Sequence, residues 1–296
     1  MLIFLGINIV LALSLSLPIS AGLLSLGQGG FMAIGAYASA VLTVWYEAPF
    51  PLALAAGGLL ASVAGLAVGF PALRIKGVYL LILTMGFGEI VRIFFLNFEP
   101  TGAASGFGGI RQATTLGGVA ATVAVLLLFF FQIRRSRIGR AIEALREDEL
   151  AAEVMGIDLT RLKLAAFGVG AFIAGVGGAL YAHYALFIDS AQFGFHRSAE
   201  IFIIVLLGGM GSFWGAVAGA VAVTLLPEAL RVIQEWRMTF FGTLLVAMMI
   251  WRPWGLIGRP RADSCSRDRT SPAGEPTASR PAAWHGPSRT SGSSAR

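Results

Sequence analysis

Long apolar stretches dominate this chain and restrict the folds that it can adopt. A helix needs about 20 mostly apolar residues to cross a bilayer, and eight stretches of the sequence approach or exceed this length. Unpaired backbone groups are too costly in lipid, so such stretches are expected to be helical. The sequence therefore predicts an all-α polytopic membrane protein. The stretches lie at residues 2–24, 27–45, 50–70, 77–98, 116–133, 163–184, 199–226 and 238–254.

Charged residues are scarce in this chain and unevenly placed along it. They make up 13% of the residues, whereas a soluble domain carries about 25%. Of the 22 basic and 16 acidic residues, 13 lie between residues 134 and 163, and a further 10 lie from residue 259 onward. The net charge of +6 comes mostly from this tail, and no basic stripe with interleaved aromatic residues indicates a nucleic-acid partner. We therefore expect membrane lipid to surround most of the chain.

The distribution of basic residues predicts how the chain crosses the membrane. Lys and Arg gather on the cytoplasmic side, which places Arg74, Lys76, the polar segment 134–163 and the Arg-rich tail in the cytoplasm. The loops at 46–49 and 99–115 then face the opposite side. The sequence thus predicts a multi-pass membrane protein.

The last part of the chain differs in composition from the rest. Residues 259–296 are rich in Ser, Pro, Arg and Gly and contain no Val, Ile or Leu. Such a segment cannot bury a core and is expected to be disordered. The predicted domains are a transmembrane domain at 1–258 and a disordered tail at 259–296.

Glycine clusters interrupt two of the apolar stretches in a similar way. LGQGGFMAIGAYASAV begins at residue 26, and LGGMGSFWGAVAGAVAV begins at residue 207. Glycine-broken segments in corresponding halves of a chain indicate the transport site of inverted-repeat transporters. The alternative is that small residues such as Gly35 and Ser39, or Gly215 and Gly219, only let helices pack closely. We also expect 199–226 to form two half-helices that enter and leave by the same face, because this returns the tail to the cytoplasm.

The polar segment between the fifth and sixth apolar stretches has the pattern of an amphipathic helix. Residues 138–155 are nearly all good helix formers, and apolar residues recur on one face at helical spacing. Gly156 is a natural terminator, and Asp158 or Thr160 can cap the following helix. The opposite face carries both signs of charge, unlike helices that lie on lipid, so the pattern favours docking into a groove of a protein partner. The predicted apolar face consists of Ile138, Ile142, Leu145, Ala152 and Met155.

Several motifs are similar, in order and spacing, to the permease subunits of importers driven by ATP-binding cassette (ABC) subunits. The longest, GRAIEALREDELAAEVMGIDLTRLKLAAFGVGAFIAGVGGAL at 139–180, resembles their cytoplasmic coupling motif. More narrowly, the chain resembles the branched-chain amino acid permease family LivM over residues 5–258. The other motifs are SLGQGGFMAIGAY at 25–37, LTMGFGEIVRIFFLN at 83–97, VLLGGMGSFWGAVAGA at 205–220 and WRPWGLIG at 251–258.

The resemblance implies a transport function, a location in a bacterial inner membrane and a set of partners. A LivM-type subunit pairs with a homologous LivH-type permease, binds two ABC ATPase subunits and receives substrate from a periplasmic binding protein. The chain would then be a non-catalytic subunit that moves branched-chain amino acids by alternating access while its partners hydrolyse ATP. Residues 134–162 would be the segment that contacts the ATPase. The residues expected to act in this coupling are Gly139, Arg140, Glu143, Leu145, Arg146 and Gly156.

A few polar side chains lie within the apolar stretches and are candidates for the substrate pathway. Ionisable residues at membrane depth are functional candidates by default, and Glu89 and Arg92 can pair on one helix face. The alternative for these two is a purely structural ion pair. Glu200 is also simply favourable near a helix N-terminus, and Gln28 can bind substrate or cap backbone groups. The expected pathway residues are Gln28, Glu89, Arg92 and Glu200.

Motifs that the sequence lacks limit its other functions. No phosphate-binding loop of the G-x-x-x-x-G-K-[ST] type occurs, so ATP is expected to bind to partner subunits. Two transport alternatives stay open: a permease for a related small solute, such as urea, a short amide or a sugar, and a secondary transporter driven by an ion gradient. An intramembrane enzyme would need several facing polar residues, and only Glu89 with Arg92 approaches this.

Overall fold

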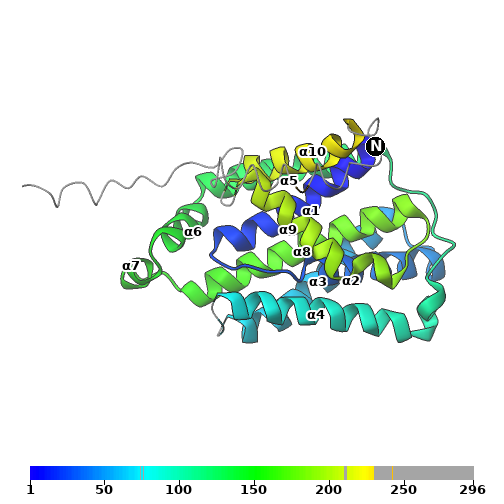
Figure 1. Ribbon diagram of the computed structural model, residues 1–296, viewed down its shortest axis with the longest axis horizontal. Helices are drawn as coiled ribbons and strands as arrows, with labels where there is room; N and C mark the ends of the chain where they lie inside the picture. Colours follow the sequence, from blue (N-terminus) through cyan, green and yellow to red (C-terminus); the bar gives the residue numbers. More distant parts are fainter. Residues whose placement is uncertain (74, 76, 210–211, 230–241, 243–296) are drawn as a thin grey trace, which may run out of the picture. The chain divides into compact units, whose positions relative to one another are not determined.

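The computed structural model describes residues 1–73, 75, 77–209, 212–229 and 242. Within these residues the chain is helical, apart from loops and one isolated β-bridge between Phe107 and Ile188. The all-α fold predicted from the apolar stretches is therefore confirmed (Figure 1). The helices are α1 (Leu2–Ser20), α2 (Gln28–Trp45), α3 (Phe50–Ala72), α4 (Val78–Asn97), η1 (Glu99–Thr101), η2 (Ala103–Ser105), α5 (Leu116–Arg135), α6 (Arg137–Glu147), α7 (Glu149–Val154), α8 (Leu159–Ala185), η3 (Ser190–Phe193), α9 (Phe195–Gly208) and α10 (Phe213–Ala229).

Most of the long helices can cross a membrane. Among the described residues, five helices are long and apolar enough to do so, namely α1, α3, α4, α5 and α8. The pair α9 and α10 raises the number to six if the two count as one broken span. Helix α2 has 18 residues, begins with the polar Gln28 and is not among them. Helices thus occupy the first seven predicted stretches.

Some of the sequence predictions concern parts of the chain outside the described residues. Arg74 and Lys76, on which part of the orientation depends, belong to these parts. So do the stretch 238–254, apart from Gly242, and the tail at 259–296. These expectations stay predictions.

The centre of the bundle is built on α1 and α8. Of their most apolar windows, 78% and 72% of the residues are buried, against 17% to 33% for α3, α4 and α5. Helix α8 packs against α1, α2 and α3 (Figure 1). The central helices therefore face protein, whereas α3, α4 and α5 present apolar surfaces to the surroundings of the bundle.

Glycines let several of these helices approach closely. A Cβ atom on Gly57 of α3 would lie 2.7 Å from the carbonyl oxygen of Gly35 in α2, and one on Gly175 of α8 would lie 2.8 Å from that of Gly57. A Cβ atom on Gly215 of α10 would lie 2.5 Å from the carbonyl oxygen of Gly208 in α9. No larger residue fits such approaches without moving a backbone. The packing interpretation of the small residues is therefore correct for Gly35 and Gly215.

Helices α9 and α10 form the broken pair that the second glycine cluster predicts. Their axes differ in direction by 117° across the break. A bend beyond a right angle turns α10 back toward the end of the bundle at which α9 begins (Figure 1). The first glycine cluster also coincides with a break, because residues 21–27 are not helical and α2 begins at Gln28.

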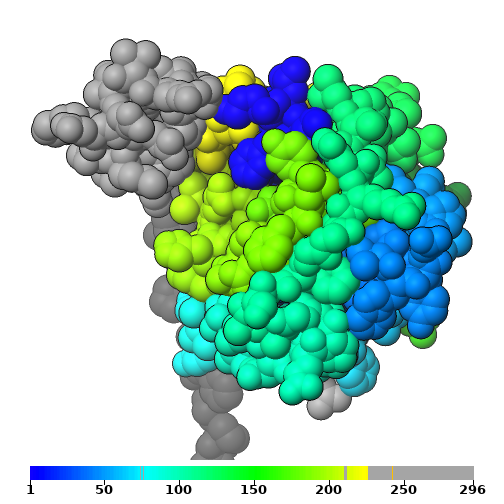
Figure 2. Space-filling model, turned by 90° about the vertical axis from the view of Figure 1, so that its right-hand side faces the viewer, coloured from blue at the N-terminus to red at the C-terminus, as the bar shows by residue number. Residues whose placement is uncertain are grey.

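Two loops that the sequence places on one side of the membrane do lie together. The loop at 46–49 and the segment 99–115 meet at the end of the bundle opposite α6 and α7 (Figure 1). An Nη2 atom of Arg111 lies 3.5 Å from Oε1 of Glu47, and both side chains are largely exposed. Figure 2 looks onto this end, where the segment after α4 runs across the ends of its neighbours. The opposite end carries the charged segment between α5 and α8.

Candidate functional site

The charged segment between α5 and α8 forms two helices instead of one. The prediction of a single helix over 138–155 is wrong at Asp148, whose φ of −151° is extended. The Asp148 carboxylate accepts hydrogen bonds from the backbone amides of Leu150, at 2.9 Å, and Ala151, at 3.1 Å. An aspartate that caps a helix N-terminus competes with continuation of the preceding helix. Helix α6 therefore ends at Glu147 and α7 starts afresh.

The ends of this segment have the caps that the sequence indicates. Gly156 directly follows the last turn with a φ of +82°, the left-handed conformation that glycine adopts easily. The Asp158 carboxylate accepts from the backbone amide of Arg161 at 3.1 Å and starts α8. Ser136, which the sequence reasoning did not single out, caps α6 by accepting from the Gly139 amide at 3.2 Å. The segment is thus held by defined turns at both ends.

The predicted apolar face of the segment is correct only in its central part. Ile142, Leu145 and Ala152 are buried, but Ile138 and Met155 are 57% and 66% exposed. The break at Asp148 divides the segment into α6 and α7, so these residues do not share the face of one helix. The exposed apolar side chains of the segment are Ile138, Leu150, Val154 and Met155.

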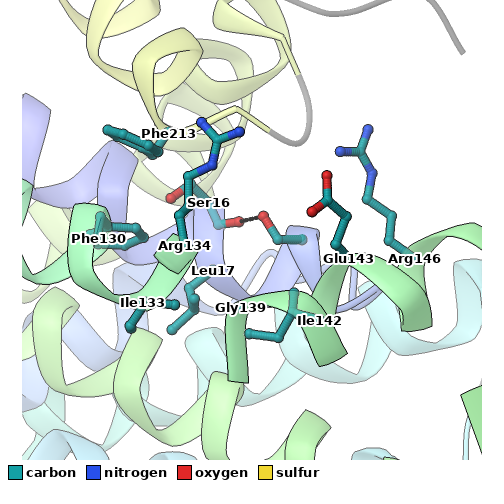
Figure 3. A pocket seen from close by; sticks show the side chains of 11 residues that line it. Ser16, Leu17, Phe130, Ile133, Arg134, Gly139, Ile142, Glu143, Arg146 and Phe213 are labelled. Atoms are coloured by element: carbon teal, nitrogen blue, oxygen red, sulfur yellow. Dashed lines mark hydrogen bonds between the residues drawn. The ribbon is translucent and has the colours of Figure 1, made fainter. Parts of the chain in front are cut away.

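A cavity of about 90 Å³ lies between α6 and the ends of α1, α5 and α10 (Figure 3). Its floor is apolar and buried, and its rim carries Arg134 from α5 with Glu143 and Arg146 from α6. In Figure 3 Arg134 and Phe213 lie on one side of the cavity and the two α6 side chains on the other. The lining residues of the floor include Leu17, Phe130, Ile142 and Phe213.

Phe213 connects this cavity to the broken helix pair. It is the first residue of α10 and is 7% exposed. The guanidinium carbon of Arg134 lies 5.5 Å from the centroid of its ring, and the ring of Phe130 stacks on it at 6.2 Å. A cation at this distance from an aromatic face is attracted to it. The end of α5, which leads directly into α6, thus contacts the residue at which the second arm of the pair begins.

The six expected coupling residues take different positions in this region. Gly139, Glu143 and Arg146 line the cavity, and Leu145 packs into the core. Arg140 is exposed and donates from Nη1 to the carbonyl oxygen of Arg135 at 3.3 Å. Gly139 lies against the backbone of Ile133, where a Cβ atom would not fit. Gly156 lies apart from the cavity, in the turn after α7.

Glu89 and Arg92 form the ion pair that their spacing predicts. The Arg92 Nε atom donates to Oε2 of Glu89 at 2.6 Å, and the two side chains are about one-third exposed. The other carboxylate oxygen of Glu89 accepts from the backbone amide of Phe195 at 3.1 Å. Phe195 is the first residue of α9, so Glu89 joins α4 to the N-terminus of the broken pair, where a negative charge is favourable.

Gln28 lies at the start of α2 and is almost fully buried. Its Oε1 atom accepts a long hydrogen bond of 3.4 Å from Ser14 of α1. The backbone amide of the next residue, Gly29, donates to Oγ of Ser198 in α9 at 2.9 Å. The start of α2, which follows the first break, is therefore in direct contact with α9, the first arm of the broken pair.

Glu200 pairs with a residue that the sequence reasoning missed. Arg197 donates from Nη1 to Oε2 of Glu200 at 2.6 Å and from Nη2 to Oδ1 of Asn8 at 3.0 Å. Asn8 in turn donates to Thr224 of α10 at 3.0 Å. The i, i+3 spacing of Arg197 and Glu200, and an isolated Asn in the apolar first stretch, were the signals that could have found this network.

The similarity of the chain to known proteins covers most of its length. The family model described as branched-chain amino acid transport system / permease component matches residues 1–249. The LivM permease protein of the high-affinity branched-chain amino acid transport system of Salmonella typhimurium is 40% identical over 292 residues, which span 87% of this chain and 67% of that protein. The LivM protein of Escherichia coli gives the same identity and coverage. The LivH permease protein of Escherichia coli is 33% identical over 144 residues, 48% of this chain and 46% of that protein. No significant match to a solved structure was found.

Proposed function

Because the chain belongs to the family of branched-chain amino acid transport permease components, we propose that it is the translocation subunit of an ABC importer for these amino acids. It is a multi-pass membrane protein, and the bacterial inner membrane is its proposed location. Its proposed partners are a LivH-type permease, two ABC ATPase subunits and a periplasmic binding protein. Relatives of the chain that are named as LivM and LivH permease proteins of the high-affinity branched-chain amino acid transport system of Escherichia coli support the pairing with a LivH-type permease.

The contact between the α6–α7 segment and the broken helix pair carries this proposal. Exposed apolar side chains such as Leu150 and Val154 lie beside charges of both signs on this segment, a surface suited to a soluble protein partner. On the bundle side, Ile142 and the cavity place α6 next to Phe213 of α10. A partner that closes on ATP can therefore push α6 and move the start of α10 with it.

The pathway for the amino acid is proposed to run beside the broken pair. Gln28, Glu89, Arg92 and Glu200 lie on three helices that contact this pair or belong to it. Broken helices within a membrane place backbone dipoles where a charged group passes. The aliphatic side chain of the transported amino acid needs only apolar walls, so the pathway needs few polar contacts. Affinity then comes mainly from the binding protein.

Reconstitution tests the proposal directly. The chain is purified with its proposed partners, placed in proteoliposomes and supplied with the binding protein loaded with radiolabelled leucine. We expect leucine to accumulate only when ATP is present on the ATPase side. Accumulation that follows an imposed proton or sodium gradient without ATP would instead favour a secondary transporter. ATP-dependent uptake of a sugar or an amide, but not of leucine, would move the proposal to a related solute.

A further inference from the structure

One ion pair of the broken helix region has an open side. Arg197 and Glu200 lie in the first two turns of α9, the first arm of the broken pair. The Arg197 side chain is only 10% exposed, whereas that of Glu200 is 43% exposed. Charged side chains at membrane depth face a bundle interior or a water-filled cavity and not lipid. The side from which Glu200 is accessible is therefore a place that a polar solute can reach.

The hydrogen bonds of this pair leave binding capacity unused. Arg197 is held by Oε2 of Glu200 and by Oδ1 of Asn8, and a guanidinium has five N–H donors. Among the described residues, Oε1 of Glu200 has no hydrogen-bond partner. An ionised carboxylate can accept at both oxygens. The pair thus has N–H donors on Arg197 and an acceptor, Oε1 of Glu200, for hydrogen bonds to a bound solute.

The neighbouring ion pair of α4 lacks this property. Both carboxylate oxygens of Glu89 are engaged, one by Arg92 and one by the backbone amide of Phe195. It therefore ties α4 to α9 and leaves no oxygen free for a solute. This contrast distinguishes Glu200 from Glu89 although their burial is similar.

Aromatic rings complete the surroundings of Arg197. Its guanidinium carbon lies 5.5 Å from the centroid of Phe4 and 6.0 Å from that of Tyr181. The ring of Tyr181 also meets the buried ring of Phe193 edge-on at 6.1 Å. An ion pair beside aromatic rings matches a molecule that has adjacent charges of opposite sign and an apolar side chain.

We propose that Arg197 and Glu200 together recognise the head group of the transported aliphatic α-amino acid. The Arg197 guanidinium binds the α-carboxylate, and the open oxygen of Glu200 binds the α-ammonium group. An arginine suits this role because its planar fork matches a carboxylate. This assignment rests on the proposed function of the chain as an amino acid permease.

In this proposal each charge of the pair satisfies the other until a zwitterion replaces part of the contact. The solute brings a carboxylate and an ammonium group, so no charge is left unpaired during the exchange. Asn8 holds Arg197 through a hydrogen bond that does not involve Glu200. The side chain of Asn8 also donates to Thr224 and so links Arg197 to α10. Both arms of the broken pair are therefore attached to the proposed site.

The test compares Glu200→Gln with the same change in an exposed pair, Glu47→Gln. The reconstituted complex with its partners is assayed for leucine uptake and ATP hydrolysis together. We expect Glu200→Gln to lower the number of leucine molecules imported per ATP by about tenfold, the effect of losing one charge-assisted hydrogen bond. Hydrolysis should continue, and Glu47→Gln should leave the ratio unchanged. A merely structural ion pair would alter assembly or thermal stability and leave this ratio alone.

A charge-inverted variant, Arg197→Glu with Glu200→Arg, guards against misfolding of the single variant. The Asn8 amide and the Thr224 hydroxyl can reverse their hydrogen bonds, so the inverted pair can form. We expect the inverted pair to restore thermal stability but not leucine uptake, because the positions that bind the α-carboxylate and the α-ammonium group then carry the wrong charges. If either variant imports as many leucine molecules per ATP as a wild type that transports leucine, the assignment of Arg197 and Glu200 is overturned, and the proposed function stands. Failure of the wild-type complex to import any amino acid overturns the proposed function, and the assignment with it.

Discussion

The guanidinium of Arg134 lies over the ring of Phe213, with 5.5 Å between the guanidinium carbon and the ring centroid. Arg134 belongs to the last turn of α5, two residues before the cap of α6, and Phe213 starts α10. The contact therefore joins the charged segment at one end of the bundle to the broken helix pair inside it. When an ATPase subunit moves α6, the contact between Arg134 and Phe213 is the first point at which this movement reaches the broken pair.

A cross-link across the cavity tests this connection. Ile142 of α6 and Phe213 of α10 line the same cavity, so we expect Ile142→Cys with Phe213→Cys to react with a short thiol-to-thiol reagent. The link should block leucine uptake, because α6 can then no longer move relative to α10. The native Cys265 is replaced by Ser in the background. The reagent should cause no loss of uptake in either single cysteine variant, each compared with its own untreated sample. Unchanged uptake in the cross-linked protein would contradict the connection.

A proline in α6 tests whether the segment must be helical. Leu145 is 5% exposed in the interior of this helix, where proline costs about 3 kcal/mol. We expect Leu145→Pro to abolish ATP-driven uptake and to weaken copurification of the ATPase. Arg137→Pro is the matched control, because residue 137 is the first of α6 and proline is tolerated there. Full uptake by the Leu145 variant would show that the helix is dispensable.

The close approach of α3 and α8 predicts a sharp contrast between two glycines. A Cβ atom on Gly175 would lie 2.5 Å from the Ala61 Cβ atom and 2.8 Å from the Gly57 carbonyl oxygen, whereas one on Gly86 of α4 would meet nothing within 4 Å. Overpacking of this kind costs about 1–3 kcal/mol. We expect Gly175→Ala to lower the unfolding temperature in detergent. Gly86→Ala should leave it unchanged or raise it slightly, because alanine favours a helix over glycine. Equal temperatures would mean that the helices can separate at no cost.

The Glu89→Gln variant tests the charge of Glu89, because it removes the charge and keeps an oxygen that can accept a hydrogen bond. The amide oxygen can still accept from Arg92 or from the Phe195 amide, but the ion pair is lost. We expect the assembled complex to form and its leucine uptake to fall several-fold, because the N-terminus of α9 loses its compensating charge. Uptake at the wild-type rate would remove Glu89 from the pathway. The measurement is initial uptake in proteoliposomes with equal amounts of complex, confirmed by size-exclusion chromatography.

The apolar stretches made the helices predictable, but not the ways in which they meet. Length and hydropathy located α1 to α5 and α8 within a few residues, because spanning a bilayer demands both. Asp148 interrupts a segment whose residues are nearly all good helix formers, because its side chain bonds to the backbone amides of the next helix and competes with a continuous one. The sequence pattern could not reveal this, because an aspartate can also lie on an exposed helix face.

The polar network shows a similar limit. Glu89 and Arg92 were found because they are close in sequence and ionisable, and Gln28 because it lies in a glycine cluster. Arg197 with Asn8 was missed because their contact joins residues 189 positions apart. Such pairing depends on how α9 folds back on α1, which the order of apolar segments does not specify.

The central claim is that a separate ATPase drives this permease through the α6–α7 segment. Its most direct test is leucine import per ATP hydrolysed by the reconstituted complex, compared between the wild type and the Leu145→Pro variant. The account predicts import that needs ATP in the wild type and is lost in the variant even though ATP is still hydrolysed. Import at full rate without ATP, or equal import per ATP in the two proteins, would contradict it.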